Sequence, residues 1–370
     1  MITRSLLKLI AKIASIVLYI LTIFSGFGGK FNPEFFTIPA IMTLIFPLLV
    51  ILTLIVSICW LISRKFITGG LGLLALFLTM SSIRMAVPIG FPEKAPENAV
   101  TFKILTFNSL HFDDLSQPDS ENQRAIHFLM ESGADIICLQ ELKTFFEDWE
   151  MKKDVPPALL DSLWKIYPYR ATHDGFNDLK VLSKYPVKFI KPLSSQVSFT
   201  PSFAAFRTDI KGNKLIVVDV HLTSYNLTQK EQNVVTDVKS VNSAKSSVKE
   251  FKQSIYAKMK ESFRNRSVVA DEIIETVKDV NCPIIICGDF NDVPASWTYR
   301  KFIDAGFKDA YSMTSFGPTP TFNKHLFLFH LDQILFRGNL LPLRSGRLNL
   351  DTSDHYPVEA EFAFVKDPSD

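Results

Sequence analysis

Cysteine is scarce in this chain, which has four in 370 residues. No two of the four have the spacing of metal ligands. Cys138 and Cys287 lie in apolar, strand-like runs, Cys59 lies in a longer uncharged run, and Cys282 precedes a proline. We therefore expect buried free thiols, which carry little information about the redox compartment.

Most of the chain has no excess of positive charge. The net charge is +2, but residues 1–90 contain seven Lys or Arg and a single acid. The remainder holds 33 basic and 37 acidic residues and is therefore mildly acidic. This balance argues against a strongly basic nucleic-acid surface. No internal repeat or low-complexity tract is present.

Charge is absent from three apolar runs near the N-terminus, namely Ile13 to Gly29, Phe35 to Ser63 and Phe66 to Ile83. At a rise of about 1.5 Å per residue, each run is long enough to cross a hydrocarbon core of about 30 Å. Buried core helices would show a polar face, and a cleaved signal peptide would be followed by polar sequence. We predict an anchor over residues 1–90, with transmembrane helices over 6–28, 37–62 and 67–87.

Basic residues flank these runs unevenly. They are Arg4, Lys8 and Lys12 at the first run, and Arg64 and Lys65 between the second and third. Because cytoplasmic loops are enriched in Lys and Arg, three spans place the N-terminus inside and the chain after Pro88 outside the cytoplasm. If the third run is not a span, the same domain faces the cytoplasm.

Short runs rich in Val, Ile and Phe follow a proline-containing linker over residues 91–99. They predict strands at Phe102–Phe107, Asp135–Leu139, Lys180–Leu182, Ala204–Ile210, Leu215–Leu222, Pro283–Cys287, Leu331–Phe336 and Val358–Phe364. Lys211-Gly212-Asn213 between two runs is a hairpin signal. Helices are predicted at Asn122–Ser132, Ser267–Val280 and Trp297–Ala305.

This pattern favours an α+β fold over residues 100–366, a four-layer α/β/β/α sandwich with two packed mixed β-sheets after a bundle of three transmembrane helices. Residues 228–266 differ in composition, with nine Lys or Arg against four acids. We interpret them as a solvated helical insertion. A basic face for anionic lipid or nucleic acid is the alternative.

Polar clusters stand at the ends of the apolar runs, where a sheet exposes side chains to a cleft. They are Thr106-Phe107-Asn108, Leu139-Gln140-Glu141, Asp219-Val220-His221-Leu222, Gly288-Asp289-Phe290-Asn291-Asp292 and Ser353-Asp354-His355. A sixth, His330-Leu331-Asp332-Gln333-Ile334, places an Asp inside an apolar run. Each cluster alone has an ordinary structural explanation, but their occurrence together in this order does not.

In these clusters the chain resembles the endonuclease/exonuclease/phosphatase superfamily, which includes abasic-site endonucleases, deoxyribonucleases and neutral sphingomyelinases. The resemblance covers residues 100 to 365 and suggests a membrane-anchored, bacterial-type member. It implies that Asp289 activates water and that Asn291 donates to the phosphate. It further implies that His221 and His355 contact phosphate oxygens, and that Asp332 orients His355.

The residue types suit a hard divalent cation, because Mg²⁺ (or Mn²⁺) prefers oxygen ligands and retains several waters. Glu141 and Asn108 are the candidate metal ligands, with Asp354 as a further ligand or support. The Asp-His pair has no serine or cysteine nucleophile in its motifs, so direct attack by water is the implied route.

The chain departs from the family pattern beside Asp332. Members commonly have an Arg before this Asp and a Tyr after it, where this chain has Leu331 and Gln333. His330 is a candidate replacement donor. Further candidates for substrate contact are Arg207, the Arg264/Arg266 pair and the aromatic residues Tyr169, Phe176 and Trp297.

These observations predict a membrane-anchored, metal-dependent hydrolase of a phosphodiester or phosphomonoester. Three alternatives stay open: a DNA or RNA nuclease, a lipid phosphodiesterase similar to neutral sphingomyelinase, and a catalytically silent binding module on the same fold. The expected partners are a phosphate-ester substrate and the membrane; nucleic acid remains a candidate, and nothing indicates an obligate protein partner.

Overall fold

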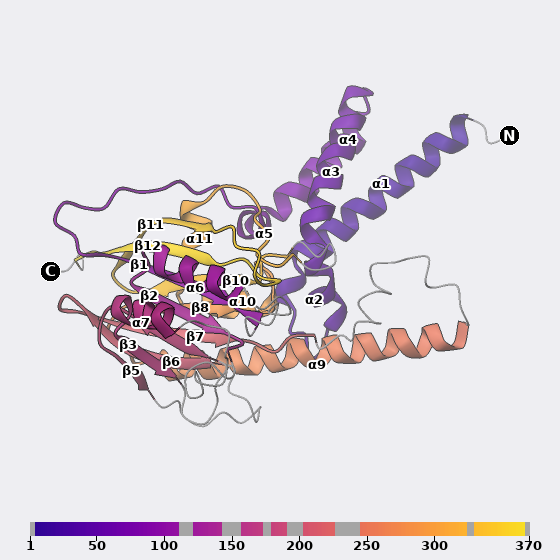
Figure 1. Ribbon diagram of the computed structural model, residues 1–370. Helices are drawn as coiled ribbons and strands as arrows, with labels where there is room; N and C mark the ends of the chain where they lie inside the picture. The colour runs from indigo at the N-terminus through magenta and orange to yellow at the C-terminus, as the bar shows by residue number, and fades with distance from the viewer. Residues whose placement is uncertain are drawn as a thin grey trace.

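The computed structural model describes residues 4–110, 121–142, 157–172, 179–190, 203–225, 245–323 and 329–366. An N-terminal group of apolar helices stands against one end of a β-sandwich (Figure 1). Phe176 and residues 228–244 of the predicted insertion lie outside the described residues.

The sandwich contains two six-stranded mixed sheets. The first has the order β11-β12-β1-β2-β4-β3, with β1 and β2 parallel. Its strands are β1 (Thr101–Asn108), β2 (Ile136–Gln140), β3 (Tyr169–Thr172), β4 (Lys180–Ser183), β11 (Leu340–Arg347) and β12 (Val358–Phe364).

The second sheet has the order β5-β6-β7-β8-β10-β9, with β7 and β8 parallel. Its strands are β5 (Val187–Ile190), β6 (Phe203–Ile210), β7 (Asn213–His221), β8 (Ile284–Asp289), β9 (Lys308–Asp309) and β10 (Asp332–Arg337). The predicted hairpin is confirmed, because Ile210 pairs with Asn213 and Lys211 and Gly212 both have positive φ angles, +53° and +90°.

Successive side chains of each strand point to opposite faces of the sheet, and this alternation separates the layers of the sandwich. In β8, Ile285 and Cys287 face the core between the sheets, whereas Ile284 and Ile286 face outward. Helices α6 (Glu121–Glu131) and α7 (Pro157–Ile166) cover the outer face of the first sheet. The C-terminal part of α9 (Lys245–Val277) and α10 (Trp297–Asp304) cover the second, and the short α11 (Ala310–Thr314) lies beside β11. The predicted four-layer sandwich is therefore confirmed.

Helix α9 contains the C-terminal part of residues 228–266, the region predicted to be a solvated helical insertion. It runs without a break from Lys245 through the predicted helix that begins at Ser267. Ser262, Phe263 and Arg266 of this helix are buried, whereas most of the side chains over 253–261 are exposed. The high content of charge suggested solvent exposure, but the three buried residues pack on the sandwich.

The N-terminal group consists of α1 (Arg4–Gly26), the 3₁₀ turn η1 (Gly28–Lys30), α2 (Thr37–Leu44), α3 (Phe46–Ile62), α4 (Phe66–Leu78) and α5 (Met80–Ala86). In the described residues only the first predicted span is one continuous helix long and apolar enough to cross a membrane. The second and third predicted spans are each broken and bent, by 67° at α2/α3 and by 66° at α4/α5.

Small residues allow α3 and α4 to pack closely. A Cβ added at Gly72 would lie 2.0 Å from the Ser57 hydroxyl, so only glycine fits that contact. Thr22 of α1 hydrogen-bonds Thr53 of α3 across 2.7 Å. Such small residues and hydroxyl contacts are typical of helices that associate within lipid.

The base of this helix group is joined to the sandwich by specific contacts. A Cβ at Gly29 would lie 1.8 Å from the carbonyl oxygen of Ala295, in the loop after β8. Arg300 of α10 donates to the Ser82 hydroxyl of α5 at 2.7 Å, and exposed Arg264 pairs with Glu34 at 3.7 Å. The helix group therefore lies against the loop that leaves Asp289.

Candidate active site

The site lies at the edge of the sandwich where β1, β2, β7 and β8 end. The register of the parallel pairs sets Asn108 beside Gln140 and His221 beside Asp289. Because parallel strands end at the same edge, polar residues following separate apolar runs come together there. We call this end of the sandwich the active-site edge.

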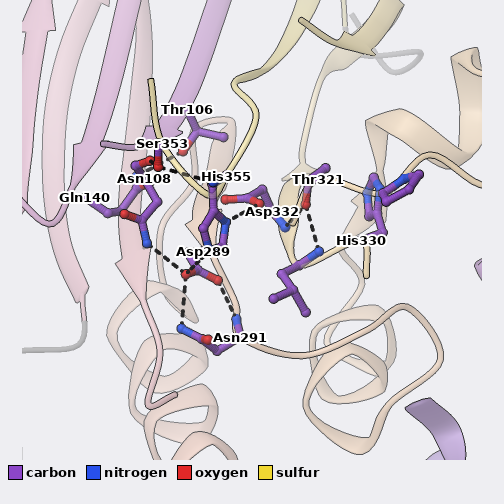
Figure 2. Close-up of polar contacts among 12 residues, drawn as sticks. Thr106, Asn108, Gln140, Asp289, Asn291, Thr321, His330, Asp332, Ser353 and His355 are labelled. Carbon is purple, nitrogen blue, oxygen red and sulfur yellow. Dashed lines mark hydrogen bonds and ion pairs between the residues drawn. The ribbon is translucent and has the colours of Figure 1, made fainter. Parts of the chain in front are cut away.

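Asp289 is at the centre of the cluster and is only 1% exposed. Its Oδ2 accepts from the side-chain amides of Asn108 and Asn291, each at 3.1 Å, and its Oδ1 accepts from the backbone N–H of Asn291 at 2.8 Å (Figure 2). Burial raises the pKa of Asp289, and the charges of His355 and His221 oppose that rise.

Three residues near the Asp289 carboxylate have positive φ angles. Asn291 has φ +48° and Glu141 has φ +56°, conformations that non-glycine residues rarely adopt. Gly288 has φ +140°, and a Cβ there would lie 2.0 Å from the Val220 carbonyl oxygen. In the Gly-Asp-Phe-Asn sequence, Gly288 thus allows the close contact of β8 with β7, while Asp289 and Asn291 supply polar side chains to the site.

His355 lies between two carboxylates. Its Nδ1 is 2.8 Å from Asp332 Oδ2 and its Nε2 is 3.6 Å from Asp289 Oδ2. Burial of the imidazole lowers its pKa, but Asp332 and Asp289 outweigh burial and raise the pKa of His355 to about 10. The ring is therefore an imidazolium at neutral pH, and Nδ1–H donates to Asp332.

Thr321 supports Asp332 and is a residue that the motifs did not identify. Its hydroxyl accepts from the backbone N–H groups of Leu331 and Asp332 at 2.9 and 3.1 Å, which fixes the start of β10 (Figure 2). Ser353 plays a similar part, since its hydroxyl donates to the Asn108 carbonyl at 2.8 Å. No sequence signal marks Thr321, because its partner lies ten residues away.

His221 and Glu141 form the more open side of the site. His221 Nε2 lies 3.4 Å from Glu141 Oε1 and 3.9 Å from Asp289 Oδ2. Both side chains are a little over one-fifth exposed. Asn108 connects them to the centre, because its Nδ2 also donates to Glu141 Oε1 at 3.1 Å.

Two groups of residues can be tested for their fit to a divalent cation. Asp289, Asp332 and His355 hold ligand atoms within 4.8 Å of one another. In that group the protonated imidazole already compensates both carboxylates, and a metal ligand must be a neutral imidazole. Glu141 and Asn108 fit better, because both side chains carry oxygen atoms, they lie next to each other, and the Glu141 side chain is 24% exposed, as Mg²⁺ with its retained waters requires.

A polar network lies behind the site between the sheets. Gln140 Nε2 donates to Asp219 Oδ1 at 2.6 Å and to the Thr106 hydroxyl at 2.9 Å. Burial raises the pKa of Asp219 well above its ordinary value. The network connects β1, β2 and β7 directly beneath the residues that carry the site.

Seven predicted site residues come together, namely Asn108, Glu141, His221, Asp289, Asn291, Asp332 and His355. Asp354 is adjacent and half-buried, and its charge is one cause of the raised pKa of His355. It is not among the described residues whose ligand atoms converge as a metal-binding group.

The predicted substrate contacts are not brought to this edge. Arg207 is in register with Ile216, five residues along β7 from His221, which is roughly 16 Å away at about 3.3 Å per residue. Tyr169 pairs with Ser183 of β4, and Ser183 pairs in turn with Ile136 at the start of β2. Tyr169 therefore lies at the end of the first sheet that is far from the active-site edge. A strand pattern gives the face of a side chain but not the end of the sheet, so the roles of Arg207 and Tyr169 in substrate contact stay predictions.

His330, Arg266 and Trp297 have structural contacts instead. His330 Nδ1 is 2.6 Å from the Thr319 carbonyl, and its ring packs on Tyr311. Arg266 is fully buried and pairs with Asp292 at 3.4 Å, while exposed Arg264 pairs with Glu34. Trp297 donates to the Ser267 hydroxyl at 2.9 Å.

Comparison with known structures gives matches across the sandwich. The catalytic domain of human Nocturnin is 17% identical and has a TM-score of 0.47, covering 72% of this chain and 95% of its own. An endonuclease/exonuclease/phosphatase from Beutenbergia cavernae is 15% identical with a TM-score of 0.47, covering 71% and 72%. Beta toxin from Staphylococcus aureus, in a variant solved with bound magnesium ions, is 15% identical with a TM-score of 0.43, covering 72% and 100%.

A search of curated proteins gave no match. A family model described as a domain of unknown function matches residues 7–85. The model of the Endonuclease/Exonuclease/phosphatase family, whose members hydrolyse phosphate esters with divalent metals, matches residues 105–355. This match spans every converging site residue, and the chain belongs to that family of phosphate-ester hydrolases.

Proposed function

We propose that this protein is a membrane-anchored phosphoesterase, dependent on Mg²⁺ or Mn²⁺, in which water activated by Asp289 attacks a phosphodiester or phosphomonoester directly. One observation carries the proposal: a buried carboxylate with a raised pKa sits between an imidazolium and two amides at an edge that reaches solvent. A base whose pKa is moved toward neutrality is suited to accept a proton from water.

Asp289 is the proposed general base, and Asn291 and Asn108 hold it in place. Both amide hydrogens of Asn291 are engaged, with Asp289 Oδ2 at 3.1 Å and the Leu222 carbonyl at 2.9 Å. The proposed hydrogen bond from Asn291 to the phosphate therefore requires one of these contacts to exchange when substrate binds. Positioning of Asp289 is the role this arrangement supports directly.

His355 is proposed to stabilise the negative charge that develops on the phosphate oxygens. Its Nδ1–H is held by Asp332, which leaves Nε2–H directed at the Asp289 side of the site. A protonated donor that is already oriented stabilises a transition state without reorganisation. His221, whose Nε2 lies 3.9 Å from Asp289 Oδ2, is the second proposed phosphate contact.

Glu141 and Asn108 are the proposed holders of the cation, with Asp354 as support. The partly exposed Glu141 carboxylate and the buried Asn108 amide beside it, joined by a hydrogen bond of 3.1 Å, would hold the ion. A bound divalent cation supplies positive charge next to the phosphate and leaving group. The chain's residues supply the base, the donors and their orientation.

Membrane attachment through the N-terminal helices is part of the proposal and rests on α1, whose length and composition suit a span. The basic residues at the start of α1 and between α3 and α4 favour a cytoplasmic N-terminus and an extracytoplasmic sandwich. This orientation requires that both bent helix pairs also cross the bilayer.

The substrate class can be tested with the full-length protein in detergent micelles. Mg²⁺- and Mn²⁺-dependent product release would be measured on a soluble phosphodiester, a phosphomonoester, DNA, RNA and sphingomyelin, with a chelator as control. We expect metal-dependent turnover of at least one ester. Folded protein without turnover on any of them would instead support a silent binding module.

The nuclease alternative stays open. Arg207 and Arg266, proposed from the sequence as phosphate contacts for any ester, are respectively distant from the active-site edge and fully buried. If DNA or RNA proves to be the preferred substrate, its backbone is contacted by other groups.

The metal site is tested by Glu141→Gln, which keeps the size of the side chain but removes its charge. We expect the Mg²⁺ concentration for half-maximal turnover to rise at least about tenfold, in line with loss of a carboxylate ligand. Glu275→Gln is the matched control, because Glu275 is an exposed residue of α9 whose side chain pairs with Lys278. Equal metal dependence in the two variants would remove Glu141 from the site.

A further inference from the structure

Exposed apolar side chains gather where the sandwich meets the N-terminal helices. Ile89, Phe91, Met313 and Phe316 are 67%, 67%, 41% and 72% exposed, and we call them the juxtamembrane patch. Elsewhere in the described part of residues 88–366, the other large exposed hydrophobic side chains are Tyr169 and Tyr256, each with a hydroxyl. Single exposed apolar residues are ordinary, but a gathering of four at one place indicates an interaction surface.

The patch is a fixed unit built from two chain segments. Ile89 and Phe316 form an antiparallel bridge, and Gly90 N–H donates to the Ser315 carbonyl at 2.8 Å. Phe91 N–H donates to the Met313 carbonyl at 3.2 Å. A Cβ at Gly90 would lie 2.3 Å from the Met313 carbonyl carbon, so glycine permits this close approach. The segment after α5 is therefore attached to the sandwich.

The patch lies immediately next to the base of the N-terminal helices. Ile89 is three positions after Ala86 at the end of α5, which limits the distance between their Cα atoms to about 10 Å. Helix α5 itself is held at that base, because the Ser82 hydroxyl donates to the Gly26 carbonyl of α1 at 2.5 Å. Figure 1 shows α5 and α11 close together below the upper ends of α1, α3 and α4.

We propose that the juxtamembrane patch inserts into the headgroup and acyl boundary of the bilayer that holds α1, an inference that rests on the proposed membrane anchoring. Apolar and aromatic side chains at this depth contribute membrane affinity without crossing the bilayer. The base of the helix group carries a second exposed set, Phe35, Phe36 and Ile38, at 75%, 59% and 60%. Phe36 caps the start of α2 and Ile89 closely follows α5, so both sets adjoin the helix group that the bilayer would hold.

The contact with lipid orients the active-site edge. Phe316 is five residues before Thr321, whose hydroxyl fixes the start of β10 and with it Asp332. The Thr321 carbonyl also accepts from Tyr356 N–H, next to His355. One short segment therefore joins the lipid contact to the residues that orient the imidazolium, and the site is held beside the membrane surface.

Quenching of tryptophan fluorescence by lipid tests the proposal without any need for activity. Full-length Phe316→Trp, Phe91→Trp and Tyr169→Trp would be reconstituted into nanodiscs of phosphatidylcholine, plain or brominated near the top of the acyl chain. Tyr169 is a matched control, being a 41% exposed aromatic residue at the far end of the first sheet. Subtracting the wild-type signal removes the contribution of the four native tryptophans.

We expect bromination to reduce the emission added at positions 316 and 91 by about half or more, because an interfacial side chain lies within roughly 5–10 Å of the upper acyl chain. The emission added at position 169 should not change. Equal quenching at the three positions in protein that elutes with the nanodiscs would overturn the patch alone. Protein that elutes apart from the nanodiscs would contradict the anchoring itself and the patch with it.

Discussion

The buried pair of Arg266 and Asp292 gives the sharpest test of how α9 supports the site. Arg266 Nε lies 3.4 Å from Asp292 Oδ2, and both side chains are at most 1% exposed. The guanidinium lies 4.6 Å from the Tyr225 ring and 4.7 Å from the Phe263 ring, and it donates to the Thr223 carbonyl at 2.8 Å. Asp292 directly follows Asn291, so the pair holds the loop that leaves Asp289.

Arg266→Met keeps an apolar side chain between the two rings but leaves the Asp292 carboxylate buried without its cation. We expect the free energy of unfolding to fall by about 3–5 kcal/mol, as for other buried pairs that lose one partner. The double variant Arg266→Met/Asp292→Asn removes both charges and should recover part of that loss. A double-mutant cycle then gives the coupling between the two residues.

The measurement is urea unfolding of the full-length protein in detergent micelles, followed by near-ultraviolet circular dichroism. Arg264→Met is the matched control, because Arg264 is exposed two residues earlier in α9 and its change should stay within about 0.5 kcal/mol. If Arg266→Met is no more destabilising than Arg264→Met, the pair does not hold α9 to the loop after β8.

Three further predictions concern the centre of the fold. Burial raises the pKa of Asp219, so this carboxyl keeps its proton in the folded protein to a higher pH than in the unfolded chain. The folded protein therefore loses stability as the pH rises from about 4 toward the folded pKa. Asp219→Asn should have a higher urea midpoint than wild type at about pH 8 and no advantage at about pH 4. Gly288→Ala combines a positive φ with a clash on the Val220 carbonyl and should lower the unfolding free energy by about 3 kcal/mol in the same assay. His355→Ala should reduce kcat on the preferred ester by about 10² to 10³ with the fold intact, and a reduction under about tenfold would argue against a transition-state contact.

Much of the sandwich was predictable because its central strands are apolar on both faces. All eight predicted strands are present, as β1, β2, β4, β6, β7, β8, β10 and β12. The four strands that were not predicted, β3, β5, β9 and β11, lie at the outer positions of the two sheets. There burial is partial, and β11 also contains Pro342 and a register shift between Pro342 and Arg344, so its pattern is not that of a regular strand.

The catalytic cluster was predictable for a different reason. Asn108, His221 and Asp289 each close an apolar run, and the parallel pairing of β1 with β2 and of β7 with β8 brings such endings to one edge. Contacts between residues far apart in sequence were not predictable. Thr321 holds Asp332, and Arg266 meets Asp292, through registers and helix packing that no local pattern records.

Charge composition was the least reliable guide. Seventeen of the residues predicted as a solvated insertion lie outside the described part of the chain, but the remainder belongs to α9, which turns Phe263 and Arg266 into the core. A count of Lys and Arg records charge without regard to burial, and the acid that compensates Arg266 lies 26 residues later. Only the fold shows that this cation is buried and paired with Asp292.

The central claim is that Asp289 activates water for attack on a phosphate ester. Turnover of a soluble phosphodiester at saturating Mg²⁺ should be compared for full-length wild type, Asp289→Asn and Asp271→Asn. Asp271 is an exposed residue of α9 that pairs with Lys301. We predict that Asp289→Asn folds normally and loses at least about 10² in kcat, the scale of general-base catalysis, while Asp271→Asn keeps wild-type turnover. Equal turnover in the two variants would contradict the claim.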